Sequence, residues 1–553
     1  MEHFRHIVEN FLLMETADDP ETTRVLQDVF ALIKDQKEIR FFVDGAHHFG
    51  HQAASINLMR RLIDRTGYAG RLCIIFAENP SLPPNSTAHK LAILLPGVDP
   101  RKIAASVITY GPCRHISFLP YNDRHRLRDE VTLGFTGGAD EMSINLAREL
   151  KVIYFLRLQP YLWDDHASKK ADPYYASSRI ETPQGQSFYM VDAHSSFRSL
   201  PFTFPPSLCA DVSEEIWNWY ATTQNFDQDL RINTKNARAV YQMSQEHTRL
   251  GLWPLYGLHQ FRDQISEIAL NIIFTAFGAQ QVLGRPIMAC CFNKPTAIPH
   301  FEALLSPFAD DLVSRDFELT AFKNALGREY ARVMGRGELS QEMLDRFVCE
   351  TARHVGPWIE QGARLVCLST YDFVQGTYMD IASSLQATMN RAAQYDVIVA
   401  LLGPVPGDVY NAFFARSALP GVFEGQATSS LMISSGKAFL QVHREDSEIT
   451  DNYPATVGLF NYGEVASACR ETALQLRSQR CLHYLQRDHT ANPRDYFRQL
   501  SRISKFLIDT QDPASQVSSY FNALGSYYRQ DIHDKFVLGV LALLTSQLVD
   551  DAI

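Results

Sequence analysis

Two segments of the 553-residue chain combine residue types and spacings that suit catalysis and ligand binding. The first spans residues 44–54, DGAHHFGHQAA, and places His47, His48 and His51 within five positions. Imidazole titrates near neutral pH, so a histidine can act as a general base on a hydroxyl acceptor when another group orients its second ring nitrogen. Asp44 is close enough in the sequence to be that group.

The same histidines have two further interpretations. Each is equally well explained as a packed or solvent-facing loop residue. His47 and His51 also have the spacing that places two metal ligands on one face of a helix. Gly50 lies between them and disfavours a regular helix, and no cysteine or acidic partner has a matching spacing. We therefore expect neither a metal site nor a required cofactor.

The second segment, residues 419–437, reads LPGVFEGQATSSLMISSGK and indicates a short buried strand followed by a helix. The first turn of such a helix offers free backbone N–H groups and the positive end of the helix dipole, which together favour an anion. An ordinary N-capped helix is the alternative, because caps of this composition are common. The candidate ligand contacts are Glu424, Gly425, Gln426, Thr428 and Ser429.

The composition restricts the class of protein. Hydrophobic residues make up 46% and charged residues 21%, which excludes wholesale disorder, and the length exceeds what one core accommodates. A net charge of −10 gives no reason to expect nucleic acid as the main partner. No secretory signal and no transmembrane segment are expected, and the nine scattered cysteines favour a reducing cytoplasm, although specialised secretion stays open.

Alternating strand and helix patterns position both segments and predict an α/β protein. A first series has strands at 39–43, 72–76, 105–110, 131–135 and 152–156, with a helix at 52–65. A second has strands at 287–292, 364–368, 397–401, 419–423 and 438–442. We predict four units: a helical preface at 1–37, an α/β domain at 38–283 with a helical insertion at about 213–283, a second α/β domain at 284–460, and a helical segment at 461–553.

Further candidates follow other predicted strands, because open α/β sheets bind ligands at the carboxyl ends of their strands. Each also has an ordinary explanation as a connection or a helix cap. Asp140 and Glu141 are alternatives to His51 as the base, and Lys437 and Arg416 are cations able to offset a diphosphate charge. The second domain contributes Ser369, Thr370, Tyr371 and Gly403 as candidate donor contacts.

The two segments carry a family resemblance. Residues 50–62, GHQAASINLMRRL, resemble the first βα turn of GT-B-fold glycosyltransferases, in which Gly50 and His51 stand at the Gly-His pair. The second segment resembles the donor-phosphate segment of that superfamily. Phe423 and Leu431 depart from the pattern, because relatives with a His-Cys-Gly-type segment have histidine and an acidic residue there.

The resemblance implies two Rossmann-like domains facing a cleft, with helical extensions at both ends. It further implies a metal-independent glycosyltransferase that takes a nucleotide-sugar donor and transfers the sugar to a protein, glycan or small-molecule acceptor. Two alternatives stay open. One is a sugar-nucleotide epimerase or hydrolase on the same fold, and the other is a non-catalytic transferase fold acting as a binding or toxin/effector scaffold.

Overall fold

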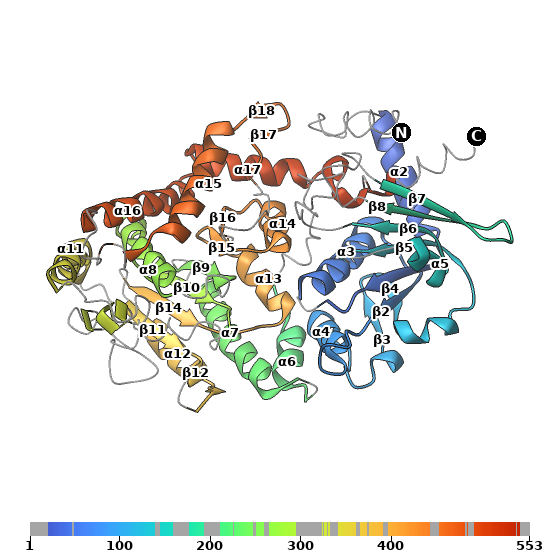
Figure 1. The fold of residues 1–553 in the computed structure, drawn as a ribbon, viewed down its shortest axis with the longest axis horizontal. Coiled ribbons are helices and arrows are strands. Elements are labelled where there is room, and N and C mark those ends of the chain that lie inside the picture. The colour runs from blue at the N-terminus through green and yellow to red at the C-terminus, as the bar shows by residue number, and fades with distance from the viewer. Residues whose placement is uncertain are drawn as a thin grey trace.

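The described residues form two α/β lobes, each built on its own sheet (Figure 1). The computed structural model describes residues 20–46, 49–138, 144–158, 176–192, 211–224, 226–246, 250–258, 265–294, 323–324, 326–328, 330–331, 341–360, 365–372, 375–390, 396–442, 453–481, 484, 492–537 and 539–541. The predicted α/β class is therefore confirmed.

The first lobe has an eight-stranded mixed sheet in the order β3-β4-β2-β1-β5-β6-β8-β7. Neighbouring strands from β4 to β8 are parallel, and β3 and β7 are antiparallel edges. The strands are β1 (Glu38–Val43), β2 (Arg71–Phe76), β3 (Val107–Tyr110), β4 (Cys113–Pro120), β5 (Val131–Thr136), β6 (Val152–Arg157), β7 (Ala176–Glu181) and β8 (Ser187–Asp192).

The strand order of this sheet reverses between β1 and β5. From β1 the chain adds β2 and β4 on one side, whereas β5 starts the series β6 and β8 on the other. The carboxyl ends of β1 and β5 therefore form the topological switch point, the usual ligand position in open α/β sheets. The helices of this lobe are α2 (Pro20–Lys34), α3 (Gly50–Thr66), α4 (Ser86–Leu94) and α5 (Ile144–Glu149).

The second lobe has a six-stranded, fully parallel sheet in the order β11-β14-β10-β9-β15-β16. Its strands are continuous apolar runs, as expected where a parallel sheet is covered on both faces. Its order reverses between β9 and β15. The strands are β9 (Gly251–Leu255), β10 (Ile287–Cys291), β11 (Leu365–Ser369), β14 (Val397–Leu401), β15 (Gly421–Phe423) and β16 (Phe439–Gln441).

The position of strand β9 differs from the predicted helical insertion at about 213–283 and from the predicted domain boundary at 283/284. It lies in residues expected to be helical, and it pairs in parallel with β10 through the crossover helix α8 (Ile265–Leu283). The Gly284-Arg285-Pro286 turn, taken as a domain boundary, is thus an internal turn of a βαβ unit. Helix α7 (Gln228–Glu246) also packs against second-lobe helices, so the lobes divide before residue 211.

The other helices of the second lobe pack around its sheet, and α15, α16 and α17 lie within the predicted C-terminal helical segment at 461–553. Helix α17 packs on α14, and α16 packs on α8. Two small hairpins, β12–β13 (Tyr371–Asp372, Thr377–Tyr378) and β17–β18 (Thr456–Val457, Phe460–Asn461), complete the lobe. The helices are α6 (Glu214–Thr222), α11 (Gln341–Glu360), α12 (Ala382–Asn390), α13 (Gly407–Ala415), α14 (Gln426–Ser434), α15 (Gly463–Ser478), α16 (Pro493–Asp509) and α17 (Gln516–Tyr528).

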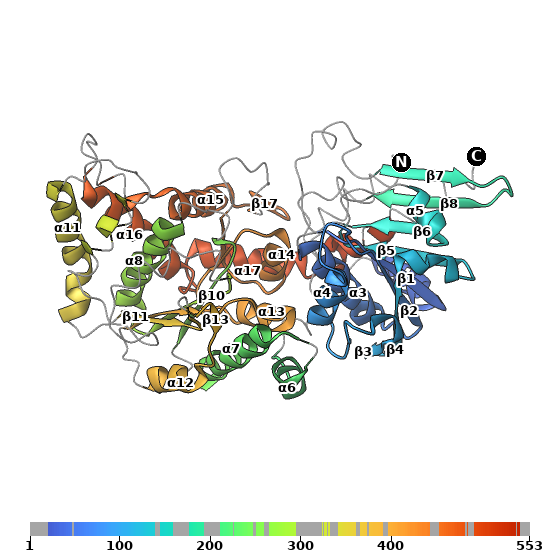
Figure 2. The same cartoon turned by 60° about the horizontal axis from the view of Figure 1, so that its bottom comes forward.

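Buried ion pairs and a ring contact hold the lobes together. Arg60 of α3 donates to Asp408 of α13 at 2.7 Å, and both side chains are largely buried. The C-terminal chain returns to the first lobe, where Asp534 accepts from Arg61 at 2.6 Å and Phe536 packs on Phe135. In both views, α13 and α14 lie on the side of the second lobe that faces α3 and α4 (Figures 1 and 2).

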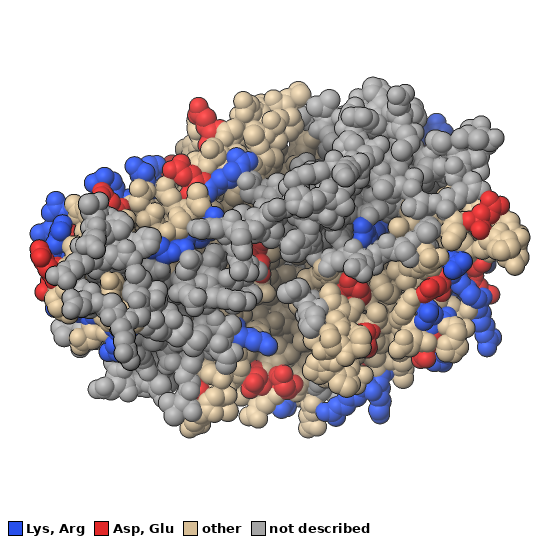
Figure 3. Space-filling model, in the orientation of Figure 1, with Lys and Arg blue, Asp and Glu red and all other residues tan. Residues whose placement is uncertain are grey.

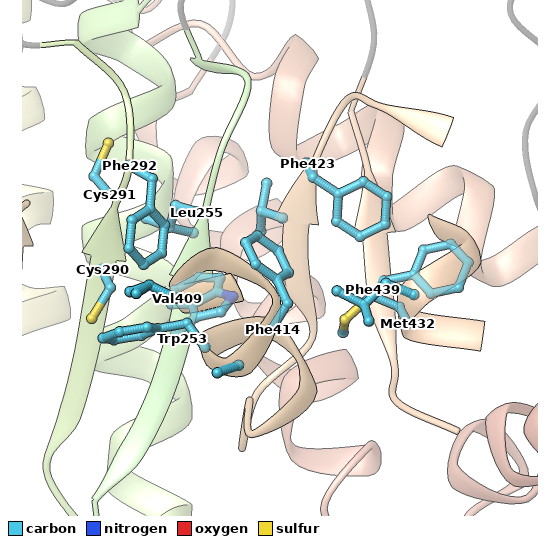
Figure 4. Packing of buried hydrophobic residues seen from close by; sticks show 14 of the residues in the cluster. Trp253, Leu255, Cys290, Cys291, Phe292, Val409, Phe414, Phe423, Met432 and Phe439 are labelled. Atoms are coloured by element: carbon cyan, nitrogen blue, oxygen red, sulfur yellow. The ribbon is translucent and has the colours of Figure 1, made fainter. Parts of the chain in front are cut away.

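An aromatic cluster anchors α13 and α14 on the second sheet. Phe414 of α13 lies between Phe292 and Phe423, with ring centroids 6.4 and 6.0 Å away, and Phe423 continues the cluster to Phe439 (Figure 4). Burying an aromatic side chain of this size contributes roughly 1.5–3 kcal/mol. The cluster therefore fixes α13 against strands β15 and β16, which flank α14 in the sequence.

The surface carries charges of both signs. On the face seen in Figure 3, the acidic and basic side chains of the described residues are interspersed. Among the described helices, none combines the length and apolar character needed to cross a membrane.

Candidate functional site

The carboxyl end of β1 brings His51 and Asp44 together. His51 stands in the first turn of α3, with only 4% of its surface exposed, and its Nδ1 lies 2.9 Å from Asp44 Oδ2. The second carboxylate oxygen, Oδ1, accepts from the backbone N–H of Ala46 at 3.3 Å. The sequence indicated Asp44 as the orienting group, and the geometry is that of an oriented imidazole, which would exchange protons through Nε2.

Polar contacts fix the loop that carries Asp44. Gln52 Nε2 donates to the carbonyls of Asp44 (2.9 Å) and Ala46 (3.2 Å). Lys90 of α4 donates to the Ala46 carbonyl at 2.5 Å, and burial lowers its pKa while Asp44 and Glu78 partly offset that effect. Helices α3 and α4 thus both fix the conformation of this loop.

The loop after β5 packs closely against the first turns of α3. The N–H of Gly137 donates to Ser55 Oγ at 3.0 Å, and a Cβ on Gly137 would lie 2.5 Å from the backbone of Ala54. Only glycine permits this approach. The neighbouring hydroxyl of Thr136 is fully buried and has no hydrogen-bond partner. Four predicted candidates lie outside the described residues: His47, His48, Asp140 and Glu141.

The second predicted segment lies at the switch point of the other sheet. Helix α14 starts at Gln426, directly after β15, with Gly425 as N-cap and no side-chain capping hydrogen bond. Thr428 Oγ1 lies 3.0 Å from the hydroxyl of Tyr410 on α13, and Ser429 is almost fully buried. The side chain of Gln426 is outside the described part of the chain.

Glu424 occupies the turn between β15 and α14. Its side chain packs over Gly257 after β9, where a Cβ would lie 2.2 Å from Glu424 Cγ, so the close approach requires glycine at this positive-φ position. Burial raises the pKa of Glu424 to about 7. Burial and the nearby Glu424 raise the pKa of Tyr256 to about 12, and Tyr256 contacts Tyr410 edge-to-face.

The two glycines singled out by the resemblance have open surroundings. Among the described residues, no atom lies within 4 Å of the Cβ position of Gly50 or Gly425. Gly425 also has an ordinary extended φ of −86°, so the protein itself does not require glycine there. The two departures from the family pattern, Phe423 and Leu431, are fully buried in the aromatic core and would not contact a ligand.

The other predicted donor loops lie away from α14. Ser369 Oγ donates to the Tyr371 carbonyl, Thr370 Oγ1 donates to the Leu401 carbonyl, and Tyr371 packs on Tyr378, so these side chains serve local structure. Their strand, β11, is four strands from β15, roughly 19 Å at about 4.8 Å per strand.

Gly403 follows β14, three strands from β15, or roughly 14 Å. A Cβ there would lie 2.7 Å from Tyr378, so the position is packed by protein. The cations are also engaged: Arg416 pairs with Asp211, and Lys437 donates to the Ser417 carbonyl at 3.2 Å. The strand order therefore does not place these loop residues and cations beside the first turn of α14.

Two surface cavities lie outside the predicted sites. One, of about 520 Å³, lies between α7 and α12, and another, of about 340 Å³, lies among α8, α11 and α16. No predicted site residue lines either. Within the described ranges, no three His, Cys, Asp or Glu side chains gather as metal ligands would.

Several residues at these two sites were not predicted: Gln52, Lys90, Tyr256, Gly257 and Tyr410. Gln52 follows His51 directly and was available to local reasoning. The others come from different elements, and only the folded chain brings them to the sites.

In comparisons with known proteins, no family model and no curated protein matches the chain.

Proposed function

We propose that the protein is a metal-independent glycosyltransferase that uses a nucleotide-sugar donor. The reaction would take place between two Rossmann-like lobes, with the acceptor on the first lobe and the donor on the second. The position of α13 and α14 opposite α3 and α4 supports this arrangement (Figures 1 and 2). The acceptor class, whether protein, glycan or small molecule, stays open in the proposal.

In this proposal His51 is the general base. Its Nε2 would take the proton from the acceptor hydroxyl as that oxygen attacks the anomeric carbon of the donor sugar. Asp44, 2.9 Å from Nδ1, would hold the productive tautomer and stabilise the imidazolium that forms. Asp140 and Glu141 are the alternative bases.

The donor diphosphate is assigned to the first turn of α14. The N–H groups of that turn, the helix dipole and the Thr428 hydroxyl would offset the charge on the departing nucleoside diphosphate. The open space beside Gly425 supports this assignment, because a ligand can approach the backbone there. Glu424 is a neighbouring contact whose charge depends on pH.

The observation that carries the proposal is the oriented His51–Asp44 pair at the switch point of the first sheet. A buried imidazole bonded to a carboxylate at the ligand-binding edge of an α/β sheet is suited to abstracting a proton. Hydrolysis or epimerisation of a sugar nucleotide would use the same residues, so only product analysis separates these chemistries.

Thermal-shift measurements with UDP-, GDP-, ADP- and dTDP-sugars test the proposal. A ligand that binds only the folded state at about 100 times its Kd adds about 2.7 kcal/mol to the free energy of unfolding. We expect at least one of these donors to raise the Tm. If none does, both the transferase and the hydrolase or epimerase functions are excluded, and the scaffold alternative remains.

A further inference from the structure

Lys90 links the His51–Asp44 pair to the next helix. It lies on α4, and its Nζ donates to the carbonyl of Ala46 at 2.5 Å, two residues after Asp44. Its charge also interacts with Asp44 itself. The hydrogen bond therefore holds the ammonium group on the loop that carries Asp44, where its charge acts on that carboxylate.

Among the described residues, three charged groups lie in or near this pair. In the described residues, the β1 loop contributes Asp44, the β2 loop Glu78 and α4 Lys90, whereas the glycines after β5 bring no charge. The Glu78 carboxylate accepts from the N–H groups of Thr87 and Ala88 at 3.0 Å and so caps α4. Lys90 is thus the cation nearest to Asp44 in this set.

An aspartate paired with histidine favours the imidazolium form, because the opposite charge stabilises it. A general base must instead be neutral at the working pH. A nearby ammonium opposes protonation of the imidazole by direct repulsion and by partly neutralising Asp44. Lys90 carries such a positive charge, and its position would let it oppose protonation of the imidazole.

We propose that Lys90 is a positioning residue that keeps the His51 imidazole in its neutral, proton-accepting form. The inference rests on the proposed role of His51 as the base. It separates two effects of one side chain: the positive charge acts on the imidazole, and the hydrogen bond to Ala46 fixes the loop.

Three substitutions separate charge from hydrogen bonding. Lys90→Arg keeps both, Lys90→Gln keeps a donor without the charge, and Lys90→Met removes both. The readout is the pH midpoint of the His51 imidazole in the full chain, measured by NMR on histidine-labelled protein, with its signal assigned by His51→Gln. Lys102→Met, which removes an exposed lysine just beyond α4, is the matched control.

We expect Lys90→Gln and Lys90→Met to raise the His51 midpoint by about one pH unit, a size typical of a nearby unit charge. Lys90→Arg and Lys102→Met should stay near the wild-type value. An unchanged midpoint in Lys90→Gln would overturn the inference, as would an equal shift in Lys90→Arg. If Lys90→Met does not fold, the Gln and Arg variants decide.

The outcome is independent of the proposed reaction, because the titration needs no substrate. A shifted midpoint without turnover of any nucleotide sugar would leave the effect of Lys90 on His51 standing and exclude the transferase. For an active enzyme, the acidic limb of the kcat/KM pH profile should move upward with the same midpoint in Lys90→Gln.

Discussion

The two switch points differ in how strongly contacts within the protein fix the candidate site residues. At the first, Asp44 is held by His51 and a backbone N–H, and Gln52 and Lys90 fix the same loop. At the second, α14 starts at Gln426 and Thr428 Oγ1 lies 3.0 Å from the Tyr410 hydroxyl. Neither helix has a side-chain cap, and the Cβ positions of Gly50 and Gly425 are equally open among the described residues. The two sites therefore differ in the hydrogen bonds that fix the Asp44 loop, and not in the space beside their glycines.

The carboxyl groups at the two sites show the same contrast. Asp44 receives two hydrogen bonds, and Glu424 is packed over Gly257, where burial raises its pKa to about 7. Desolvation favours the neutral form of the Glu424 carboxyl group. The second site can therefore change its charge near neutral pH.

Removal of the imidazole should give the largest effect. His51→Ala is expected to lower turnover by about 100- to 10,000-fold, the range typical of losing a general base. Donor binding should persist, because the diphosphate is assigned to the other lobe. Steady-state kinetics and donor-induced Tm shifts measure both quantities. Retained turnover would move the base to Asp140 or Glu141, and lost donor binding would mean that the two sites are not separate.

Glu424→Gln should change how stability depends on pH. The folded-state pKa of about 7 exceeds the ordinary 4.5, so the contribution of Glu424 is present at low pH and is lost as pH rises through 7. That difference corresponds to about 3 kcal/mol. We expect the free energy of unfolding of the variant, relative to wild type, to rise by this amount between pH 4 and pH 8. Parallel wild-type and variant curves would contradict a buried, protonatable Glu424.

Two glycine substitutions compare the packing of the sites directly. Gly137→Ala places a Cβ 2.5 Å from the backbone of Ala54 and should lower the free energy of unfolding by about 1–3 kcal/mol. Gly425→Ala meets no atom within 4 Å and should change it by about 0.5 kcal/mol or less. Denaturant unfolding measures both values. Equal costs would mean that the position beside Gly425 is as tightly packed as the position beside Gly137.

Thr428→Ala should have a small effect on stability. It removes the hydrogen bond to Tyr410, which contributes about 1 kcal/mol, and it should weaken donor binding about tenfold if the hydroxyl contacts phosphate. Tyr410→Phe removes the same hydrogen bond and leaves the Thr428 hydroxyl, so it is the matched control for titration calorimetry. Equal affinity in Thr428→Ala and wild type would exclude the phosphate contact.

Local patterns predicted much of the fold. The apolar runs at 39–43, 72–76 and 397–401 coincide with β1, β2 and β14, because each is a short run that is buried in a parallel sheet. Strand β9 was missed, since Gly251–Leu255 contains Pro254 and helical patterns flank it. The proline is tolerated because β15 pairs with β9 only through Val422 and Leu255.

The candidate site residues also divide into those that sequence spacing predicted and those that it did not. His51 and Asp44 are seven positions apart, so local reasoning brought them together. Lys90 and Tyr410 reach their sites from separate helices, and no sequence spacing indicates that contact. The predicted convergence of the loops at Ser369 and Gly403 on α14 depended on strand order, which hydrophobic patterns do not specify, and the observed order separates them.

A structure with the donor that stabilises the protein most would test the central claim most directly. We predict that the diphosphate lies against the first turn of α14, within hydrogen-bond distance of the backbone N–H groups that follow Gly425, and that the sugar points toward His51. Density for the nucleotide in the cavity between α7 and α12, with none at α14, would contradict this account.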